Sequence, residues 1–209
     1  MRERGIAYSA PMVLARRAGL KTQTRRLVRW PSWADPERDG EEMRKHLGLA
    51  YCVDGRPVKR FTCPYGVPGD RLYVRETWYD DNALRSREQA PTKPDDYIYY
   101  RADGEAREQL EQLDPPNARI WHPSIHMPRW ASRGLDEITD VRVQRVQDIS
   151  EEDAIAEGIN IHGFQGSTDG ISGREHRIEY ATLWDQIYGK RAPLASNPWV
   201  WCLTFKVIE

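Results

Sequence analysis

Residues 134–149, GLDEITDVRVQRVQDI, alternate between apolar and polar side chains almost without a break. Successive side chains of a β-strand point to opposite faces of a sheet, so this alternation predicts a long strand with one buried face. It is the strongest strand pattern in the sequence. We therefore expect the fold to be organised around the sheet that contains it.

Shorter segments with strand character occur on both sides of this strand. They are residues 5–10, 22–30, 71–78, 97–104 and 197–209. Three helices are predicted between them, and the charged segment EAREQLEQL, residues 105–113, also has helical character. The first follows Pro11, a residue suited to the first helical position, and ends before Gly19. The second, residues 150–157, begins with a capping box and ends at Gly158, and the third spans 174–189 with apolar residues at helical spacing.

Several strands with a few short helices indicate an α+β domain, built as a small β-barrel or a twisted sheet. The length of 209 residues fits a single domain over 1–209. The three cysteines form no tight pair and no metal-binding motif, so neither a metal nor another cofactor is expected. No signal peptide and no apolar run long enough for a membrane span is found, which predicts a cytoplasmic protein with no membrane partner.

Six Lys and Arg residues lie within the fourteen positions RRAGLKTQTRRLVR, residues 16–29, of a chain whose net charge is only -1. Two interpretations are open. The segment is a basic strand edge that discourages aggregation, or it binds an anion. Lys21 precedes Thr24 by three residues, a pairing that suits phosphate binding or activation of a threonine hydroxyl. Arg25 and Arg26 are able to hold an anion through two hydrogen bonds.

Two acids stand in unusual places. Glu76 lies between Val74 and Trp78 on one face of an apolar strand, so it is either buried against a cation or part of a site. Glu157 lies in the last turn of a predicted helix, where a carboxylate opposes the helix dipole. An exposed helix end is the simpler interpretation of Glu157. A proton-transfer role in a cavity is the alternative.

The segment WHPSIHMPRW, residues 121–130, gathers planar and cationic side chains in an irregular loop. Tryptophan, histidine and arginine are residues on which unpaired bases stack. A loop held to the domain by its own tryptophans is an equally good interpretation. A nuclease that uses His122 or His126 is a weaker possibility, because no second catalytic histidine is clearly placed.

Five segments together resemble the ASCH domain, which is related to the PUA domain, and are closest to its bacteriophage and prophage branch. They are AGLKTQTRR, PGDRLYVRETW, SIHMPRW, VQDISEEDAIAEGI and NPWVWCLTFKVI. The resemblance implies a small PUA-like β-barrel flanked by short helices, with an RNA- or nucleotide-binding cleft. For a phage-encoded chain, the cytoplasm would be that of the bacterial host.

A compact bacterial branch of that superfamily contains the N4-acetylcytidine amidohydrolases, which remove the acetyl group from a modified nucleoside without a metal. The resemblance implies that Lys21 is the base, Thr24 the nucleophile, and Glu157 a carrier of protons or an orienting group. Relative to that compact enzyme the chain has four additional segments, at 31–60, 79–96, 103–119 and 160–172.

Two classes of function follow. The first is a metal-independent hydrolase that removes an acyl group from a pyrimidine nucleoside. The second is a non-catalytic reader of a modified or flipped base in RNA or single-stranded DNA. Mixed and acidic added loops favour a nucleoside, a nucleotide or a short single strand over a long duplex. The expected substrate-binding residues are Ser9, Thr22, Arg25, Arg26, Glu76, Trp78, Ser124, His126, Arg129 and Trp130.

Overall fold

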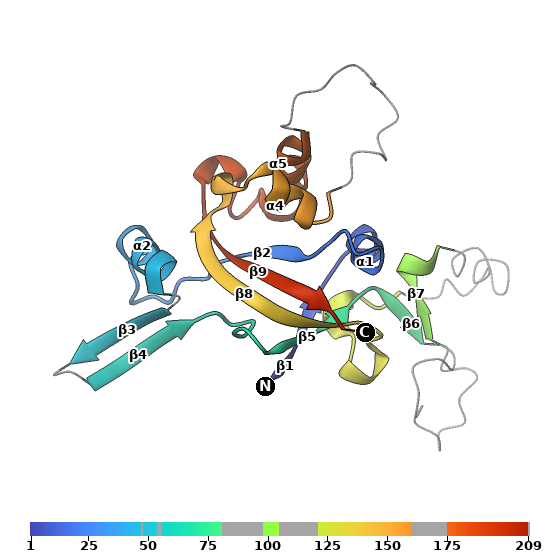
Figure 1. The fold of residues 1–209 in the computed structure, drawn as a ribbon, viewed down its shortest axis with the longest axis horizontal. Helices are drawn as coiled ribbons and strands as arrows, with labels where there is room; N and C mark the ends of the chain where they lie inside the picture. The colour runs from blue at the N-terminus through green and yellow to red at the C-terminus, as the bar shows by residue number, and fades with distance from the viewer. Residues whose placement is uncertain (47, 54–55, 81–97, 105–120, 160–174, 209) are drawn as a thin grey trace.

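The computed structural model describes residues 1–46, 48–53, 56–80, 98–104, 121–159 and 175–208. A five-stranded mixed sheet with the order β1-β5-β8-β9-β2 forms its centre (Figure 1). The strands are β1 (Glu3–Ala7), β2 (Gln23–Leu27), β5 (Arg71–Arg75), β8 (Leu135–Arg145) and β9 (Trp199–Val207). Strands β1 and β5 are parallel, and the other neighbouring pairs are antiparallel. The prediction of a mixed α+β fold is confirmed.

The sheet is open in the part of the chain that the structure describes. Strands β1 and β2 are its two edges, and no strand pairing joins them there. A side chain spans the gap instead, because the guanidinium of Arg26 on β2 donates to the carbonyl oxygen of Ala7 on β1 at 2.7 Å. The described strands therefore form a curved sheet with adjacent edges and no closed barrel.

The long alternating segment does form the longest strand, β8, and a 3-10 turn, η5 (Val146–Asp148), follows it. Its register with β9 shifts between Ile138 and Asp140. Such an irregularity bends a strand and increases its twist. Both long strands accordingly curve across the middle of the molecule (Figure 1).

Strand β9 is buried on both faces, which explains its nearly continuous apolar sequence. Trp201, Leu203 and Phe205 face the main core, together with side chains of β1, β5 and β8. Val200 and Cys202 face a second cluster formed with the helices that follow β8. Because one strand contributes to both clusters, the two layers of the fold share their central element.

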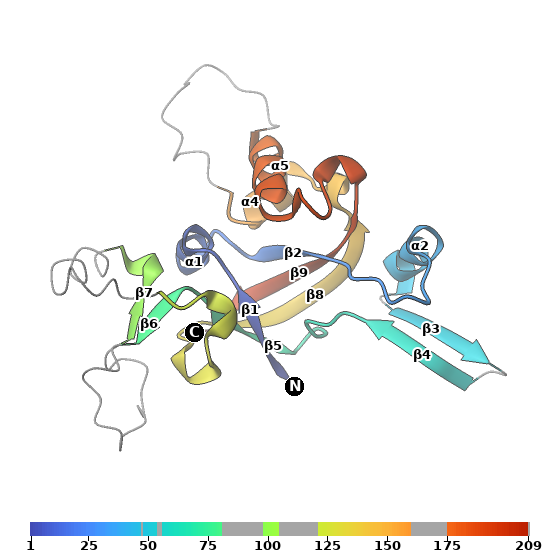
Figure 2. The same ribbon diagram turned by 180° about the vertical axis from the view of Figure 1, so that it is seen from behind.

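Four α-helices lie in the described residues: α1 (Ala10–Arg17), α2 (Pro36–His46), α4 (Glu151–Ala156) and α5 (Glu175–Tyr188). The predicted capping box is confirmed, because the Ser150 hydroxyl accepts the Asp153 N–H at 3.1 Å. Gly19 and Gly158, predicted to end helices, both have positive φ. Figures 1 and 2 show α4 and α5 packed together over the β2 edge of the sheet.

The segment 31–60 is more regular than its polar sequence indicates. It contains α2 and most of the pair β3 (Gly48–Val53) and β4 (Arg56–Thr62). Helix α2 is held by Met43, which is fully buried, and by Gly40, where a Cβ atom would lie 2.2 Å from the Trp199 ring. Met43 is the only large apolar residue of the helix, so its sequence gives little sign of a buried face.

A second small pair, β6 (Trp78–Asp80) and β7 (Ile98–Tyr100), lies at the opposite end of the molecule from β3 and β4 (Figure 2). Short 3-10 turns complete the fold: η2 (Arg101–Asp103), η3 (Ser124–His126), η4 (Arg129–Ala131) and η7 (Leu194–Ser196). Most of the added segments 79–96 and 103–119, and all of 160–172, lie outside the described residues. Among the helices that are described, none is long and apolar enough to cross a membrane.

Candidate functional site

A cavity of about 430 Å³ lies where the edges of the sheet, strands β1 and β2, meet helix α5. This volume falls within the range of about 300–1,000 Å³ that is usual for small-molecule sites. Its lining comprises Gly5, Ile6, Ala7, Tyr8, Ser9, Met12, Lys21, Thr24, Arg25, Arg26, Arg29, Tyr65, Arg75, Ile125, Glu157, Tyr180, Leu183, Trp184, Ile187 and Tyr188. Six of the predicted site residues are among them: Ser9, Lys21, Thr24, Arg25, Arg26 and Glu157. They come from three separate parts of the sequence.

Two other cavities, of about 500 and 510 Å³, lie beside α5. Each is lined mostly by apolar side chains, with one charged residue, Arg177 in the first and Glu179 in the second. Ligand sites usually combine apolar walls with a few convergent polar groups. The cavity between the sheet edges is therefore the best candidate for the functional site.

Backbone packing brings Lys21 and Glu157 together across the sequence. The two residues form an isolated antiparallel bridge, and the Thr22 N–H donates to the Ala156 carbonyl at 2.8 Å. Gly158 makes this approach possible. Its φ is +84°, and a Cβ atom there would lie 2.9 Å from the Cβ of Lys21.

The Lys21 ammonium is buried, with 2% of the residue exposed. Its nitrogen donates to the Gln23 carbonyl at 2.8 Å, to the Glu157 carbonyl at 2.6 Å and to Glu157 Oε2 at 3.0 Å. Three acceptors match the three protons of an ammonium group. Burial lowers the pKa of Lys21, whereas the Glu157 carboxylate opposes this shift.

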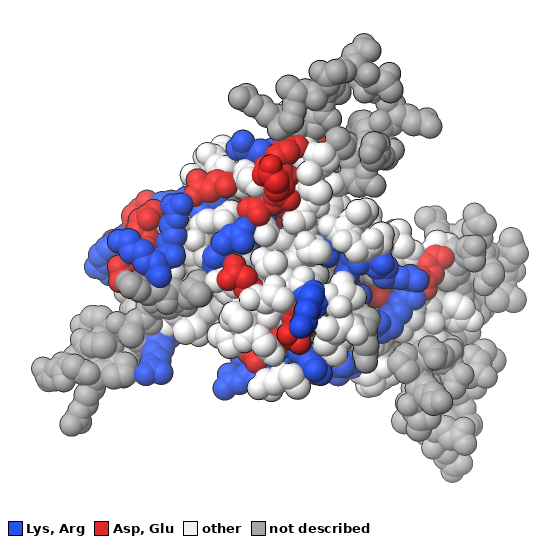
Figure 3. All heavy atoms as spheres, in the orientation of Figure 1, with Lys and Arg blue, Asp and Glu red and all other residues white. Residues whose placement is uncertain are grey.

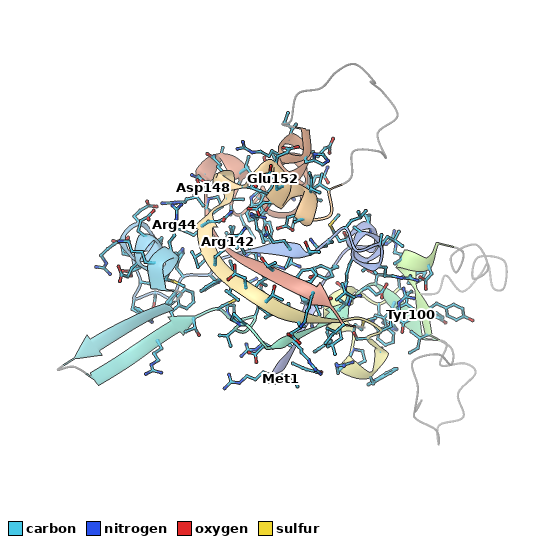
Figure 4. All side chains as sticks on the ribbon, viewed as in Figure 1. Met1, Arg44, Tyr100, Arg142, Asp148 and Glu152 are labelled. Carbon is cyan, nitrogen blue, oxygen red and sulfur yellow. The ribbon has the colours of Figure 1, made fainter. Side chains whose placement is uncertain are left out.

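The Glu157 carboxylate is held from two sides. Lys21 binds Oε2, and the buried Arg25 guanidinium donates to Oε1 at 3.2 Å. Arg25 also donates to Asp153 at 2.5 Å, and Asp153 in turn accepts from Arg142 at 2.9 Å. Arg142 extends from β8 toward α4 (Figure 4). Alternating basic and acidic side chains therefore connect the protein surface to the cavity, and they fix the Glu157 carboxylate there.

Thr24 lies in the middle of β2, opposite Leu203 of β9, and 1% of it is exposed. Its side chain lines the cavity. Among the described residues its hydroxyl has no hydrogen-bond partner, and Lys21 Nζ is not bonded to it. The hydroxyl is therefore available to a ligand.

Tyr8, which the sequence did not mark as a site residue, forms part of the same wall. Lys21 Nζ lies 5.4 Å and Arg26 Cζ lies 5.6 Å from the centre of its ring. Its hydroxyl is buried and has no partner in the described structure, and burial raises the pKa of this phenol well above its usual value. The ring is thus placed between two cations at the cavity surface.

Aromatic side chains of α5 form the facing wall. Tyr180, Trp184 and Tyr188 follow one another at helical spacing, and the Trp184 and Tyr188 rings are 4.4 Å apart. Tyr65, from the loop before β5, also lines the cavity. The helical periodicity of α5 was visible in the sequence, but nothing in it distinguished a cavity wall from an ordinary core face.

The remaining predicted residues do not line the cavity. Glu76 is buried against a cation, as one of the two sequence interpretations proposed. Arg133 donates to both of its oxygens at 2.9 and 3.1 Å, and Arg133 also bonds Asp103. Trp78 packs in a separate cluster with Tyr100 and Met127.

The loop 121–130 is irregular but ordered, as predicted. It contributes a residue to the cavity through Ile125 rather than through its aromatic or charged side chains. Arg129 pairs with Glu3 at 2.8 Å, and Trp130 packs edge-on against Trp78. Ser124, His126 and the exposed Thr22 are absent from the cavity lining.

The chain matches no protein-family model, no curated protein and no solved structure.

Proposed function

We propose that the cavity binds a nucleoside or nucleotide whose pyrimidine base carries an N-acyl group, and that it hydrolyses this amide. One observation carries the proposal. Lys21, Thr24 and Glu157, the three residues that the ASCH resemblance assigns to catalysis, line one cavity although 136 positions separate the first from the last. The resemblance was based on sequence segments alone, so this convergence supports it independently.

The fold is compatible with the same family. We interpret the curved sheet, with its two edges linked by Arg26, as the open form of a PUA-like barrel of the ASCH type. The helices α4 and α5 then stand beside the cleft, where the resemblance expects them. This family assignment is part of the proposal.

In the proposed reaction, the Thr24 hydroxyl attacks the acyl carbon and forms an ester, and the freed amine of the base leaves with a proton. Water then hydrolyses the ester. Because Lys21 Nζ lies 3.0 Å from Glu157 Oε2, transfer of one ammonium proton to Glu157 would leave a neutral amine able to accept the Thr24 proton. Burial, which lowers the pKa of Lys21, favours that transfer.

A reader of a modified base is the second candidate, and one feature favours it. All three Lys21 protons are donated to acceptors other than Thr24, so no base is bonded to the nucleophile in this arrangement. The same cavity would then recognise the base without turnover. Figure 3 shows basic and acidic side chains interspersed on the visible face, without one broad basic area, which fits a short ligand better than a long duplex.

The test is hydrolysis of N4-acetylcytidine and related N-acyl nucleosides by the wild-type protein, Thr24→Ala and Lys21→Ala. We expect turnover by the wild type and a loss of at least about 100-fold in both variants. Thr139→Ala and Lys45→Ala, at exposed positions outside the cavity lining, are the matched controls. Turnover that survives both cavity substitutions would refute the catalytic assignment. Binding of nucleosides without turnover would establish the reader.

A further inference from the structure

Three arginines at the cavity have no acidic partner in the part of the chain that the structure describes. Arg26, Arg29 and Arg75 all line it, and none of them forms an ion pair with any residue that the structure describes. Three other buried or partly buried arginines behave differently: Arg16 pairs with Asp136, Arg25 with Asp153 and Arg142 with Asp153. The three guanidinium groups therefore give this cavity positive charge that no described acid neutralises.

Backbone carbonyl groups hold two of these guanidinium groups in place. Arg26 donates to Ala7 at 2.7 Å and to Arg25 at 3.3 Å, and Arg75 donates to Ile125 at 3.1 Å. A guanidinium has five N–H donors, so each retains donors for a ligand. The Nε of Arg75 is buried without a partner. Neutral anchors of this kind orient a cation but do not neutralise it.

The three side chains also lie at a different depth from the proposed catalytic residues. Lys21 and Thr24 are buried, Arg26 and Arg75 are partly exposed, and Arg29 is exposed. The cavity thus has a buried floor that carries the hydroxyl and a more accessible rim that carries the arginines. A ligand with its acylated base at the floor would place its opposite end at the rim.

We propose that Arg26, Arg29 and Arg75 form a phosphate subsite, so that the ligand of this cavity is a phosphorylated nucleoside rather than a free nucleoside. Planar guanidinium groups bind phosphate oxygens through paired, charge-assisted hydrogen bonds. The assignment of the base rests on the proposed function, but the assignment of the phosphate does not. The phosphate belongs either to a mononucleotide or to the backbone of a short single strand.

The experiment measures the dissociation constants of cytidine, cytidine 5′-monophosphate and the dinucleotide CpC by calorimetry at low salt. We expect one of the phosphorylated probes to bind at least about tenfold more tightly than cytidine. A preference for the monophosphate identifies a nucleotide ligand, and a preference for CpC identifies a strand. Arg75→Gln and Arg29→Gln should each remove most of this gain, measured against cytidine in the same variant, whereas Arg60→Gln, at an exposed position outside the cavity lining, should retain it.

Equal affinity for all three probes, a phosphate gain that persists in both variants, or no binding of any probe would overturn the inference. The outcome is separable from that of the proposed function. Phosphate preference without hydrolysis of any acyl nucleoside would sustain the subsite and refute the hydrolase. Hydrolysis of N4-acetylcytidine without phosphate preference would support the hydrolase and refute the phosphate subsite.

Discussion

The carboxyl group of Asp136 on β8 is fully buried, and only one of its oxygens is paired. Oδ1 accepts from Arg16 at 2.7 Å, whereas Oδ2 has no partner in the described structure. Burial raises the pKa of Asp136 from 3.8 to about 6, in spite of Arg16. The folded protein therefore holds a proton between about pH 4 and pH 6 that the unfolded chain has released, and the free energy of unfolding falls as pH rises through this window.

We expect Asp136→Asn to remove this dependence. A shift from 3.8 to about 6 corresponds to a change on the order of 3 kcal/mol. Urea unfolding of both proteins from pH 4 to pH 7 should show the variant gaining stability relative to the wild type by up to about that amount as pH rises. Glu137→Gln, an acid next to it on β8 that is partly exposed, is the control. Parallel pH curves for the wild type and Asp136→Asn would contradict the prediction.

At the scale of elements, the end of α4 must approach the start of β2 closely for the cavity to form. Gly158 has a φ of +84°, and a Cβ atom there would meet Ala15 and Lys21 at 2.9 Å. Gly19, after α1, has a φ of +74° with nothing within 4 Å of such an atom. Alanine strains the backbone at both positions, because a side chain disfavours a positive φ. Only at Gly158 would the added Cβ atom also push the end of α4 away from the start of β2.

Gly19→Ala should therefore cost about 1 kcal/mol of unfolding free energy, from the left-handed backbone alone. Gly158→Ala should cost clearly more and should also weaken the proposed nucleotide binding, because it displaces Glu157 from Lys21. Urea unfolding and calorimetry on both variants measure the two effects. Equal losses of stability with binding intact would show that the close contact does not position the site.

At the scale of the whole molecule, β9 links the two apolar clusters, so we expect them to unfold together. Leu203→Ala, in the main core, should cost about 2–5 kcal/mol, and Val200→Ala, in the cluster with α4 and α5, somewhat less. Val207→Ala, on the exposed end of the same strand, should change stability by less than about 0.5 kcal/mol. Tryptophan fluorescence and circular dichroism should report coincident transitions in each variant, and separate transitions would show that the clusters are independent.

Signals confined to neighbouring residues were sufficient to predict individual elements. Alternation over 134–149 predicted β8, and the Ser150 capping box with Gly158 predicted α4. These patterns succeed because the spacing of apolar side chains and the capping of a helix end depend only on residues close together in the sequence. Helix α2 was not predicted, because Gly40 and Met43 are held by contacts with residues distant in sequence rather than by an apolar stripe of their own.

The sequence by itself therefore determined the α+β class, most strands and helices, and, through a family resemblance, Lys21, Thr24 and Glu157 as candidates. Only the tertiary structure decided the strand order, the open edges of the sheet, and which side chains meet. Glu76 and the loop 121–130 had equally suggestive sequences, yet one is paired with Arg133 and the other contributes Ile125 to the cavity. Tyr8 and Arg75 join the site because β1 and β5 pair in parallel beside β8. Such long-range contacts depend on how the whole sheet packs, which no local pattern records.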